Sequence, residues 1–150
     1  MPSDDSIPIP KFGTKQDGTD YIDRPGVYAV IQNHAGRVAI IKTNRGYFLP
    51  GGGIDFNESD IDALQREIFE EIGYQVTVLE KLGEAVEYIQ AYSDEKNYRI
   101  HSKFYRAQLD AKKAEGVEKD HRLVWLLQEN ARKLLVRQSQ TWAIQSMLNS

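Results

Sequence analysis

The chain has 150 residues, a formal net charge of -3 and no cysteine. This length fits one domain with a single hydrophobic core. The missing cysteines exclude disulfides, thiolate zinc sites and a cysteine nucleophile. Because the net charge provides no overall basic field, we expect no nucleic-acid partner, and any polyanionic ligand must meet a local basic patch.

The N-terminal residues, MPSDDSIPIPKFG, place acids and prolines where a secretory signal would place basic and then apolar residues. No apolar run approaches the ~18 residues of a membrane span. We therefore expect a cytoplasmic protein without a membrane partner. Residues 1–23 are rich in Pro, Gly, Asp, Ser and Thr, which predicts a flexible extension with a short edge strand near Phe12 or Tyr21. The domain is predicted to cover residues 24–150.

The first strands of this domain are short β-branched runs at residues 27–32 and 37–42. They flank Asn33-His34-Ala35-Gly36, which is typical of a hairpin turn. A third strand at residues 47–49 runs into Pro50, which cannot donate to a central ladder. The chain is therefore expected to leave the sheet at the glycines that follow.

A helix is predicted next, because Ile61, Leu64, Ile68 and Ile72 fall on one stripe at 3.6 residues per turn. Asn57 or Ser59 is available as its N-cap, and Gly73 suits the residue after its C-terminus. The remaining pattern predicts strands at residues 75–83, 84–92, 98–109 and 123–127, then helices at 128–135 and 139–148. This order predicts an α/β fold in which helices cover both faces of a mixed sheet.

The predicted helix carries three glutamates on one face. Glu67, Glu70 and Glu71 stand at i, i+3 and i+4, so their carboxylates repel one another. The repulsion indicates that a positive group lies among them. Carboxylate oxygens without cysteine suit Mg²⁺ or Mn²⁺, and Gly51, Gly52 and Gly53 let the backbone approach a ligand closely. An acidic solvent-facing helix after a glycine-rich loop is the alternative interpretation.

The stretch LPGGGIDFNESDIDALQREIFEEIGY resembles the Nudix box, G-x5-E-x7-R-E-U-x-E-E-x-G-U, in which U is a bulky apolar residue. The matching positions are Gly52, Glu58, Arg66, Glu67, Ile68, Glu70, Glu71, Gly73 and Tyr74. Only Tyr74 departs from the pattern, at a packing position. The order of elements and the closing strand after Glu118 are also similar to this family, over most of residues 25–148.

The resemblance implies the Nudix fold and Mg²⁺-dependent hydrolysis of a nucleoside diphosphate linked to another group X. It implies that Glu67, Glu70 and Glu71 bind the metal, with the carbonyl of Gly51 or Gly52 as a further ligand. Glu58 and Arg66 are expected to be architectural. The general base is expected to be a box glutamate or Glu118, with Glu115 and Asp120 as competitors.

Substrate phosphates require cations, and Arg99, His101 and Lys103 share one face of a predicted strand, with Lys42 and Arg45 near the hairpin end. We expect Arg45, Arg99 and Lys103, with the backbone of Gly52 and Gly53, to bind substrate. The nucleobase of the substrate could stack on Tyr28, Tyr47, Tyr88 or Tyr92, although aromatic residues in strands usually belong to the core.

The sequence leaves several alternatives open. A nucleotide-sensing Nudix-like domain without turnover, or a protein-interaction module with a residual box, would also fit the pattern, and an intact box argues against both. Within the enzyme interpretation, an oxidised nucleoside triphosphate or, through Tyr92, a diadenosine polyphosphate is the candidate substrate. The expected partner is a small-molecule nucleotide, and a homodimer is left open.

Overall fold

The structure is a computed structural model that describes residues 8–91 and 93–148. These residues form eight strands and three helices. In chain order they are β1 (Lys11–Phe12), β2 (Ile22–Ile31), β3 (Val38–Thr43), β4 (Gly46–Phe48), β5 (Gly51–Gly53), α1 (Asp60–Ile72), β6 (Tyr74–Gln90), β7 (Asn97–Lys112), β8 (Arg122–Leu126), α2 (Gln128–Leu134) and α3 (Gln138–Leu148).

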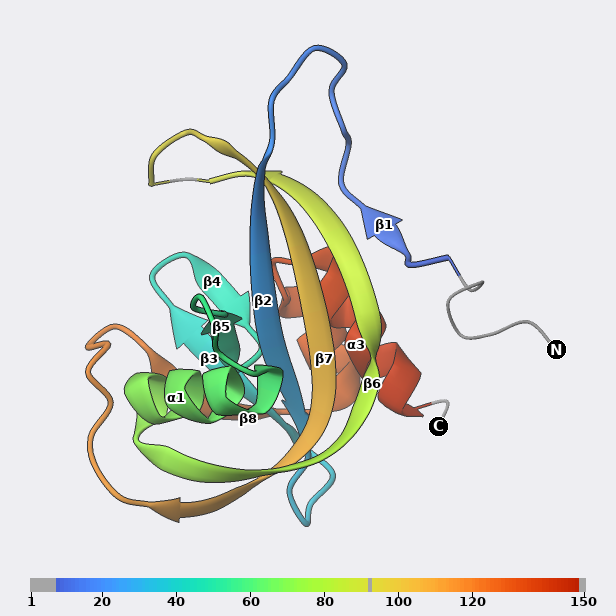
Figure 1. The fold of residues 1–150 in the computed structure, drawn as a ribbon. Coiled ribbons are helices and arrows are strands. Elements are labelled where there is room, and N and C mark those ends of the chain that lie inside the picture. Colours follow the sequence, from blue (N-terminus) through green and yellow to red (C-terminus); the bar gives the residue numbers. More distant parts are fainter. Residues whose placement is uncertain (1–7, 92, 149–150) are drawn as a thin grey trace, which may run out of the picture.

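The strands form two sheets (Figure 1). The larger sheet has the order β1-β6-β7-β2-β5 and is mixed: β2 and β7 are parallel, whereas β6 and β7 are antiparallel. The smaller sheet has the order β4-β3-β8 and is antiparallel. The predicted α/β class with a mixed sheet is confirmed, with two sheets in place of one. In the described part of the chain, no helix combines the length and the apolar composition that crossing a bilayer needs.

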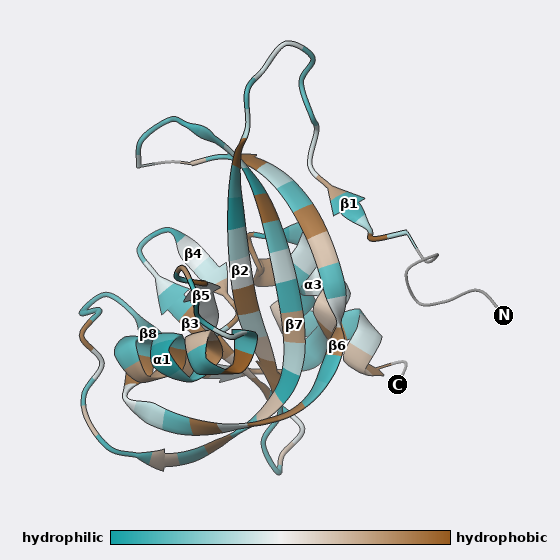
Figure 2. Cartoon of the chain, in the orientation of Figure 1, coloured by the Kyte–Doolittle hydropathy of each residue, from teal (hydrophilic) through white to brown (hydrophobic). Residues whose placement is uncertain are grey.

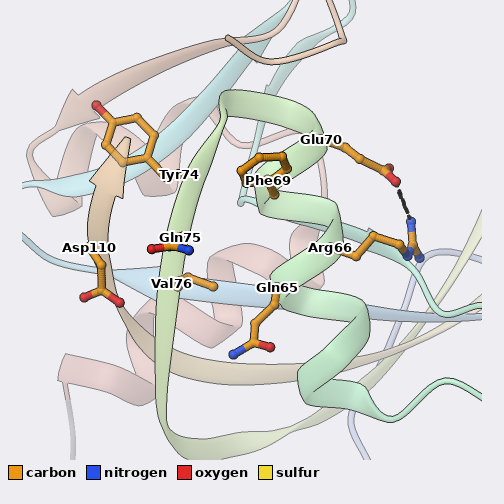
Figure 3. Close-up of a pocket in the computed structure, with 8 residues that line it drawn as sticks. All are labelled: Gln65, Arg66, Phe69, Glu70, Tyr74, Gln75, Val76 and Asp110. Atoms are coloured by element: carbon orange, nitrogen blue, oxygen red, sulfur yellow. Dashed lines mark hydrogen bonds and ion pairs between the residues drawn. The ribbon is translucent and has the colours of Figure 1, made fainter. Parts of the chain in front are cut away.

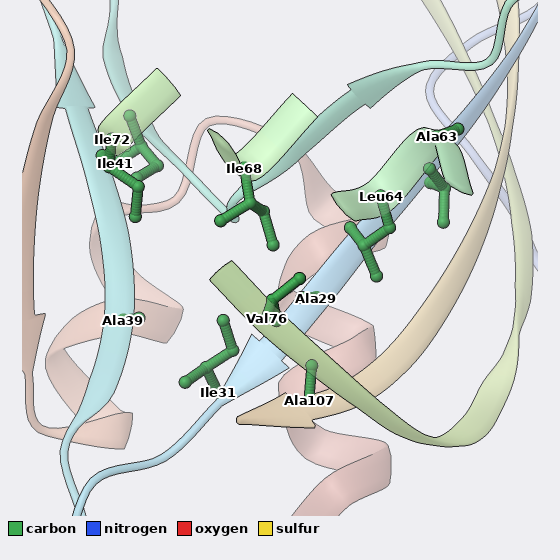
Figure 4. Packing of buried hydrophobic residues seen from close by; sticks show 11 residues of the cluster. Ala29, Ile31, Ala39, Ile41, Ala63, Leu64, Ile68, Ile72, Val76 and Ala107 are labelled. Carbon is green, nitrogen blue, oxygen red and sulfur yellow. The ribbon is translucent and has the colours of Figure 1, made fainter. Parts of the chain in front are cut away.

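Buried residues form two clusters, one on each side of the larger sheet. α1 contributes Ala63, Leu64, Ile68 and Ile72 to the first cluster, where they pack on residues of β2, β3, β6 and β7 (Figure 4). α2 and α3 cover the other side, where Ile144 and Phe104 are fully buried. Figure 2 shows the alternation of apolar and polar residues along the long strands that these two layers require.

The predicted hairpin between residues 27–32 and 37–42 is wrong. Its turn forms, since Asn33 Oδ1 accepts the N–H of Ala35 and of Arg37 at 3.0 Å, but only Gln32 and Val38 then pair as an isolated bridge. The physical reason is that β2 already pairs with β7 along one edge and with β5 along the other. β3 therefore joins the second sheet.

The predicted break between residues 75–83 and 84–92 is also wrong, because β6 runs without interruption from Tyr74 to Gln90. Gly83 has a φ of 155° and lies at a register shift against β7. A glycine in a strand marks a bulge as readily as an end, and here the bulge bends a long strand. Tyr92, a candidate for base stacking, lies outside the described residues.

The described part of the N-terminal segment packs on the domain. β1 pairs parallel with β6, as the predicted edge strand near Phe12 requires, and the Tyr21 ring meets the Tyr88 ring at 5.0 Å. Residues 1–7 lie outside the described residues. The boundary at residue 23 and the flexibility of the extension stay predictions.

Candidate active site

The helix that carries the glutamates begins and ends at fixed residues. Ser59 is its N-cap and accepts the Asp62 N–H at 3.1 Å, which settles the choice that the sequence left between Asn57 and Ser59. Gly73 ends the helix with a φ of 75°, as predicted, and its N–H donates to the Phe69 carbonyl at 2.8 Å. These two ends set the direction in which the glutamates project.

The glycines bring a strand unusually close to this helix. Gly51–Gly53 form β5, which pairs with β2, so the chain leaves the sheet of β4 at Pro50 but enters the larger sheet directly. Gly51 has a φ of 142°, and a Cβ at Gly52 would clash with the Glu67 carboxylate. A Cβ at Gly51 would clash with the Val27 carbonyl and the Tyr28 backbone, so glycine is required there, whereas the flexible Glu67 side chain could move away from a Cβ at Gly52.

Two of the glutamates meet at this backbone. Glu71 is 7% exposed, its Oε1 accepts the Gly51 N–H at 2.9 Å, and its Oε2 lies 3.2 Å from Nδ1 of His121. Burial raises the pKa of Glu71, and it raises the pKa of Glu67 to about 7. A bound cation would stabilise the charged form of both carboxylates, which burial alone disfavours.

Arg66 lies among the acidic residues and links them. Its Nε and Nη2 bind the two oxygens of Glu58 at 2.7 and 2.9 Å, and Nη2 also donates to the Gly53 carbonyl at 3.1 Å. Its Nη1 reaches Glu67 Oε1 at 3.1 Å and Glu70 at 3.3 Å. Arg66 therefore supplies part of the positive charge that the glutamate spacing predicted, and its contacts are those that an architectural role requires.

This network yields a pH-dependent contribution to stability. The Arg66 guanidinium lowers the pKa of Glu58 from 4.5 to about 2, so the native state binds the proton less readily than the unfolded chain does. The stabilisation should be complete above about pH 4.5 and lost as the pH falls toward 2. Urea unfolding of wild type and Glu58→Gln between pH 7 and pH 2.5 measures it. We expect the stability gap between the two proteins to narrow as the pH falls, and a gap of constant size would contradict the assignment.

Glu70 is the most exposed of the three helix glutamates. Figure 3 shows it turned toward Arg66, at the edge of a groove of about 600 Å³ on the outer side of α1. The groove is lined by Gln65, Phe69 and Tyr74 but not by the glycines of β5. Of the three glutamates, Glu67 and Glu71 are thus the two that contact the β5 backbone.

The donor atoms at β5 fit Mg²⁺ or Mn²⁺. Carboxylates of Glu67 and Glu71 adjoin the backbone of Gly51 and Gly52, and all of their donors are hard oxygens. Across residues 8–91 and 93–148, the ligand atoms that already lie within 4.8 Å of one another belong to Glu118, Asp120 and His121. Glu70 would have to leave Arg66 to join the site.

The loop that carries Glu118 is anchored to the end of α1. The Val117 N–H donates to the Glu70 carbonyl at 2.8 Å, and a Cβ at Gly116 would clash with the Glu71 carbonyl. Glu118 then groups with Asp120 and with His121, which contacts Glu71. Glu115 pairs instead with Lys112. A further cavity of about 620 Å³ is lined by Glu71, Glu115 and Glu118, so Glu115 also adjoins the glutamate site, although it does not belong to the group of Glu118, Asp120 and His121.

Two cavities that share residues lie on the Arg45 side of the site, and Glu71 lines the first of them. The first, of about 530 Å³, is lined by Glu71, Gly51 and Gly52 and also by Tyr28, Asn44, Arg45 and Phe48. The second cavity, of about 730 Å³, is also lined by Tyr28, Asn44, Arg45 and Phe48. Its other lining residues include Gly53, Arg24, Arg137 and Gln140. Arg45 is held there by the turn after β3, where its N–H donates to the Thr43 hydroxyl at 3.0 Å.

The structure does not bring Arg99 and Lys103 to these cavities. They lie on the opposite face of β7 from Ile100, which lines the second cavity. Arg99 lies 3.5 Å from an Asp23 oxygen, and Lys103 lies 3.2 Å from Asp60 at the start of α1. Alternation along the strand predicts that these residues share a face, but it cannot tell which face adjoins the glutamates.

Sequence reasoning missed Arg24 and Arg137. Arg24 precedes Pro25 and stacks on the Tyr98 ring at 3.9 Å, and Arg137 lies between the two C-terminal helices, 5.7 Å from the Phe48 ring. Neither belongs to a spaced motif. They come together because β2, the β3–β4 turn and the start of α3 meet in three dimensions, and the sequence carries no short-range signal for that meeting.

The NUDIX domain profile matches residues 23–140, and no curated protein matches the chain. Among solved structures, the chain is similar to the MutT NUDIX hydrolase from Burkholderia pseudomallei (25% identity, TM-score 0.61), with 83% of this chain and 98% of that one covered. It is also similar to the MutT protein from Methanosarcina mazei Go1 (17% identity, TM-score 0.67), with 88% of this chain and 97% of that one covered. A third similar structure is the E. coli dihydroneopterin triphosphate pyrophosphohydrolase (17% identity, TM-score 0.61), with 84% of this chain and 96% of that one covered.

The matched region includes the whole box from Gly52 to Tyr74 and the loop with Glu118. The described helix, glycine strand and closing strand β8 all lie in or beside it. The chain belongs to the NUDIX family and is a pyrophosphohydrolase.

Proposed function

We propose that this enzyme uses Mg²⁺, or Mn²⁺ in its place, to hydrolyse a phosphoanhydride bond in a nucleoside diphosphate linked to another group X. The observation that carries the proposal is the position of Glu67 and Glu71 at the Gly51–Gly52 backbone, where Glu71 and Arg45 line one cavity and Arg45 also lines a neighbouring cavity with Arg24 and Arg137. Acidic residues at one end suit a divalent cation, and guanidinium groups at the other suit phosphate oxygens.

In this proposal Glu67, Glu70 and Glu71 hold the metal, with the Gly51 or Gly52 carbonyl as a further ligand. When bound, the metal lowers the pKa of a coordinated water and neutralises charge on the phosphates. Glu118, three residues before His121, accepts the proton of the attacking water. Water oxygen bonds to phosphorus, the bridging P–O bond breaks, and the two phosphate-containing products leave.

The second cavity supports a proposal for the substrate end of the site. Arg45, Arg24 and Arg137 are the cations that line it, and they replace Arg99 and Lys103 as proposed phosphate contacts. Three cations in one cavity favour a chain of phosphates, as in a nucleoside triphosphate or a dinucleoside polyphosphate. Phe48 and Tyr28 supply aromatic surface beside them for a flat ring.

A substrate panel tests the proposal. It should contain ordinary and oxidised nucleoside triphosphates, dinucleoside polyphosphates, nucleotide sugars and, because one similar structure is named for it, a pterin triphosphate. We expect turnover of at least one compound with Mg²⁺ or Mn²⁺, its loss in EDTA and its return when Mg²⁺ is restored. Product identification by mass spectrometry locates the broken bond. Full turnover in EDTA would overturn the metal assignment.

A further inference from the structure

The start of α3 forms one wall of the second cavity, of about 730 Å³, which is called the substrate cavity below. Arg137 immediately precedes this helix, and Gln140 lies in its first turn, and both line the cavity beside Phe48. The Arg137 guanidinium lies 5.7 Å from the centre of the Phe48 ring. The position of the Arg137 side chain relative to the phosphates therefore depends on how the N-terminus of α3 is held.

A buried carboxylate from the larger sheet holds that N-terminus. Glu87 of β6 is 6% exposed, and its Oε1 accepts the Ser139 N–H at 3.0 Å and the Ser139 hydroxyl at 2.6 Å. Its Oε2 lies 3.3 Å from the N–H of Gln138. Glu87, although it lies in a strand, thus accepts the free N–H groups at the start of α3 as an N-cap residue would. Its charge also suits the positive end of the helix dipole.

Two further bonds connect the start of α3 and the residues just before it to the chain segment that leads into β5. Gln140 Oε1 accepts the Leu49 N–H at 2.8 Å, two residues before Gly51, and the Val136 N–H donates to the Tyr47 carbonyl at 3.0 Å. The Arg137 carbonyl accepts the Gln140 N–H at 3.1 Å. Arg137 therefore lies in a segment that is fixed on one side to β6 and on the other to the chain leading into β5.

From these contacts we propose that Glu87 is a positioning residue for substrate binding: by capping α3 it fixes Arg137 at the cavity wall where the guanidinium contacts a substrate phosphate. The proposal rests on the proposed function, because that function places phosphates between the box and the arginines. It assigns to a residue outside the box, 50 positions before Arg137 in the chain, a share in substrate affinity.

The experiment uses inorganic triphosphate as the probe, with Mg²⁺ at a fixed concentration and binding measured by calorimetry. The proteins are wild type, Arg137→Ala, Glu87→Gln and the double variant, with melting temperatures recorded for each. We expect Arg137→Ala to raise the Kd about tenfold or more, the scale of one charge-assisted hydrogen bond, and Glu87→Gln to raise it by less, because a glutamine oxygen can still accept the Ser139 N–H. In the Arg137→Ala background, Glu87→Gln should change the Kd little further.

Two variants keep this test decisive. Glu84→Gln is the matched control, since Glu84 lies on the opposite face of β6 and binds Lys81 and His101, and we expect an unchanged Kd. Ser139→Ala removes one of the bonds to Glu87 and should raise the Kd in the same direction by less, even where Glu87→Gln folds poorly.

Additive losses in the double variant, or a Glu87→Gln protein that melts lower but keeps the wild-type Kd, would overturn the positioning role. These outcomes differ from a failure of the proposed function. Non-additive binding without turnover of any panel compound would support the role of Glu87 and contradict the hydrolase proposal. Turnover of a panel compound, together with additive binding losses in the double variant, would support the proposed function and contradict the role of Glu87.

Discussion

Replacing Glu71 with glutamine is expected to lower kcat by about 10²-fold or more while leaving the fold intact. Loss of a metal ligand misplaces both the attacking water and the charge that faces the phosphate, and small misplacements of this kind cost about 10²-fold. The fold should persist because a glutamine oxygen can still accept the Gly51 N–H and its amide can face His121. Steady-state kinetics and circular dichroism measure the two effects.

The same substitution should change stability in opposite directions with and without metal. In EDTA, Glu71→Gln removes a buried charge whose pKa burial has raised, so its melting temperature should equal or exceed that of wild type. With Mg²⁺ the order should reverse, because a ligand that binds the native state stabilises it and the variant binds metal less well. Glu129→Gln, an exposed change on α2, is the control and should leave kcat and the rise in melting temperature caused by Mg²⁺ unchanged. A variant that melts lower in EDTA and turns over normally would make the glutamates a structural ion-pair network.

Replacing Glu118 with glutamine should lower kcat by about 10²-fold or more if Glu118 accepts the proton of the attacking water, which is the usual scale for a positioned base. KM should change little, because Glu118 lines neither of the two cavities that contain Arg45. The measurement is the pair of kinetic constants at saturating Mg²⁺, for the substrate that the panel identifies.

Glu115→Gln is the matched control for this prediction. Glu115 lies in the same loop, three residues earlier, and lines a cavity with Glu118, but its side chain is 89% exposed, pairs with Lys112 and does not belong to the group formed by Glu118, Asp120 and His121. We expect wild-type kinetics from it. A normal kcat for Glu118→Gln would return the role of base to a box glutamate or assign it to Asp120.

The local part of this structure could be predicted from the sequence. The apolar stripe of α1 from Leu64 to Ile72, its cap at Ser59 and its end at Gly73 follow from side-chain spacing within one turn or two. Ile61, which was predicted to belong to this stripe, is 45% exposed, and Ala63 is buried in its place. The sequence predicted that Gly51 and Gly52 let the backbone approach a ligand, whereas the structure places Gly51 against β2 and Gly52 against the Glu67 side chain. Spacing also predicted that a positive group lies among the glutamates, although it could not say that Arg66 would supply part of that charge.

The long-range part could not be predicted in this way. The turn at Asn33 looks like hairpin chemistry, but the ladder depends on whether β2 has a free edge, and β5 and β7 occupy both. Arg99 and Lys103 share a face, yet only the packed structure shows that this face adjoins the start of α1 and not the cavity. Arg24 and Arg137 come from segments more than 100 residues apart, so no local pattern could join them.

The central claim is that the carboxylates beside Gly51 and Gly52 hold the catalytic metal, and a Mn²⁺ titration followed by electron paramagnetic resonance tests it most directly. The measurement compares wild type with Glu71→Gln and with Glu118→Gln, which separates the box from the acidic loop group. We predict that wild type binds Mn²⁺, that Mg²⁺ displaces it, and that Glu71→Gln weakens binding by about tenfold or more. Wild-type affinity in Glu71→Gln, with binding lost in Glu118→Gln, would contradict the claim and place the metal in the loop.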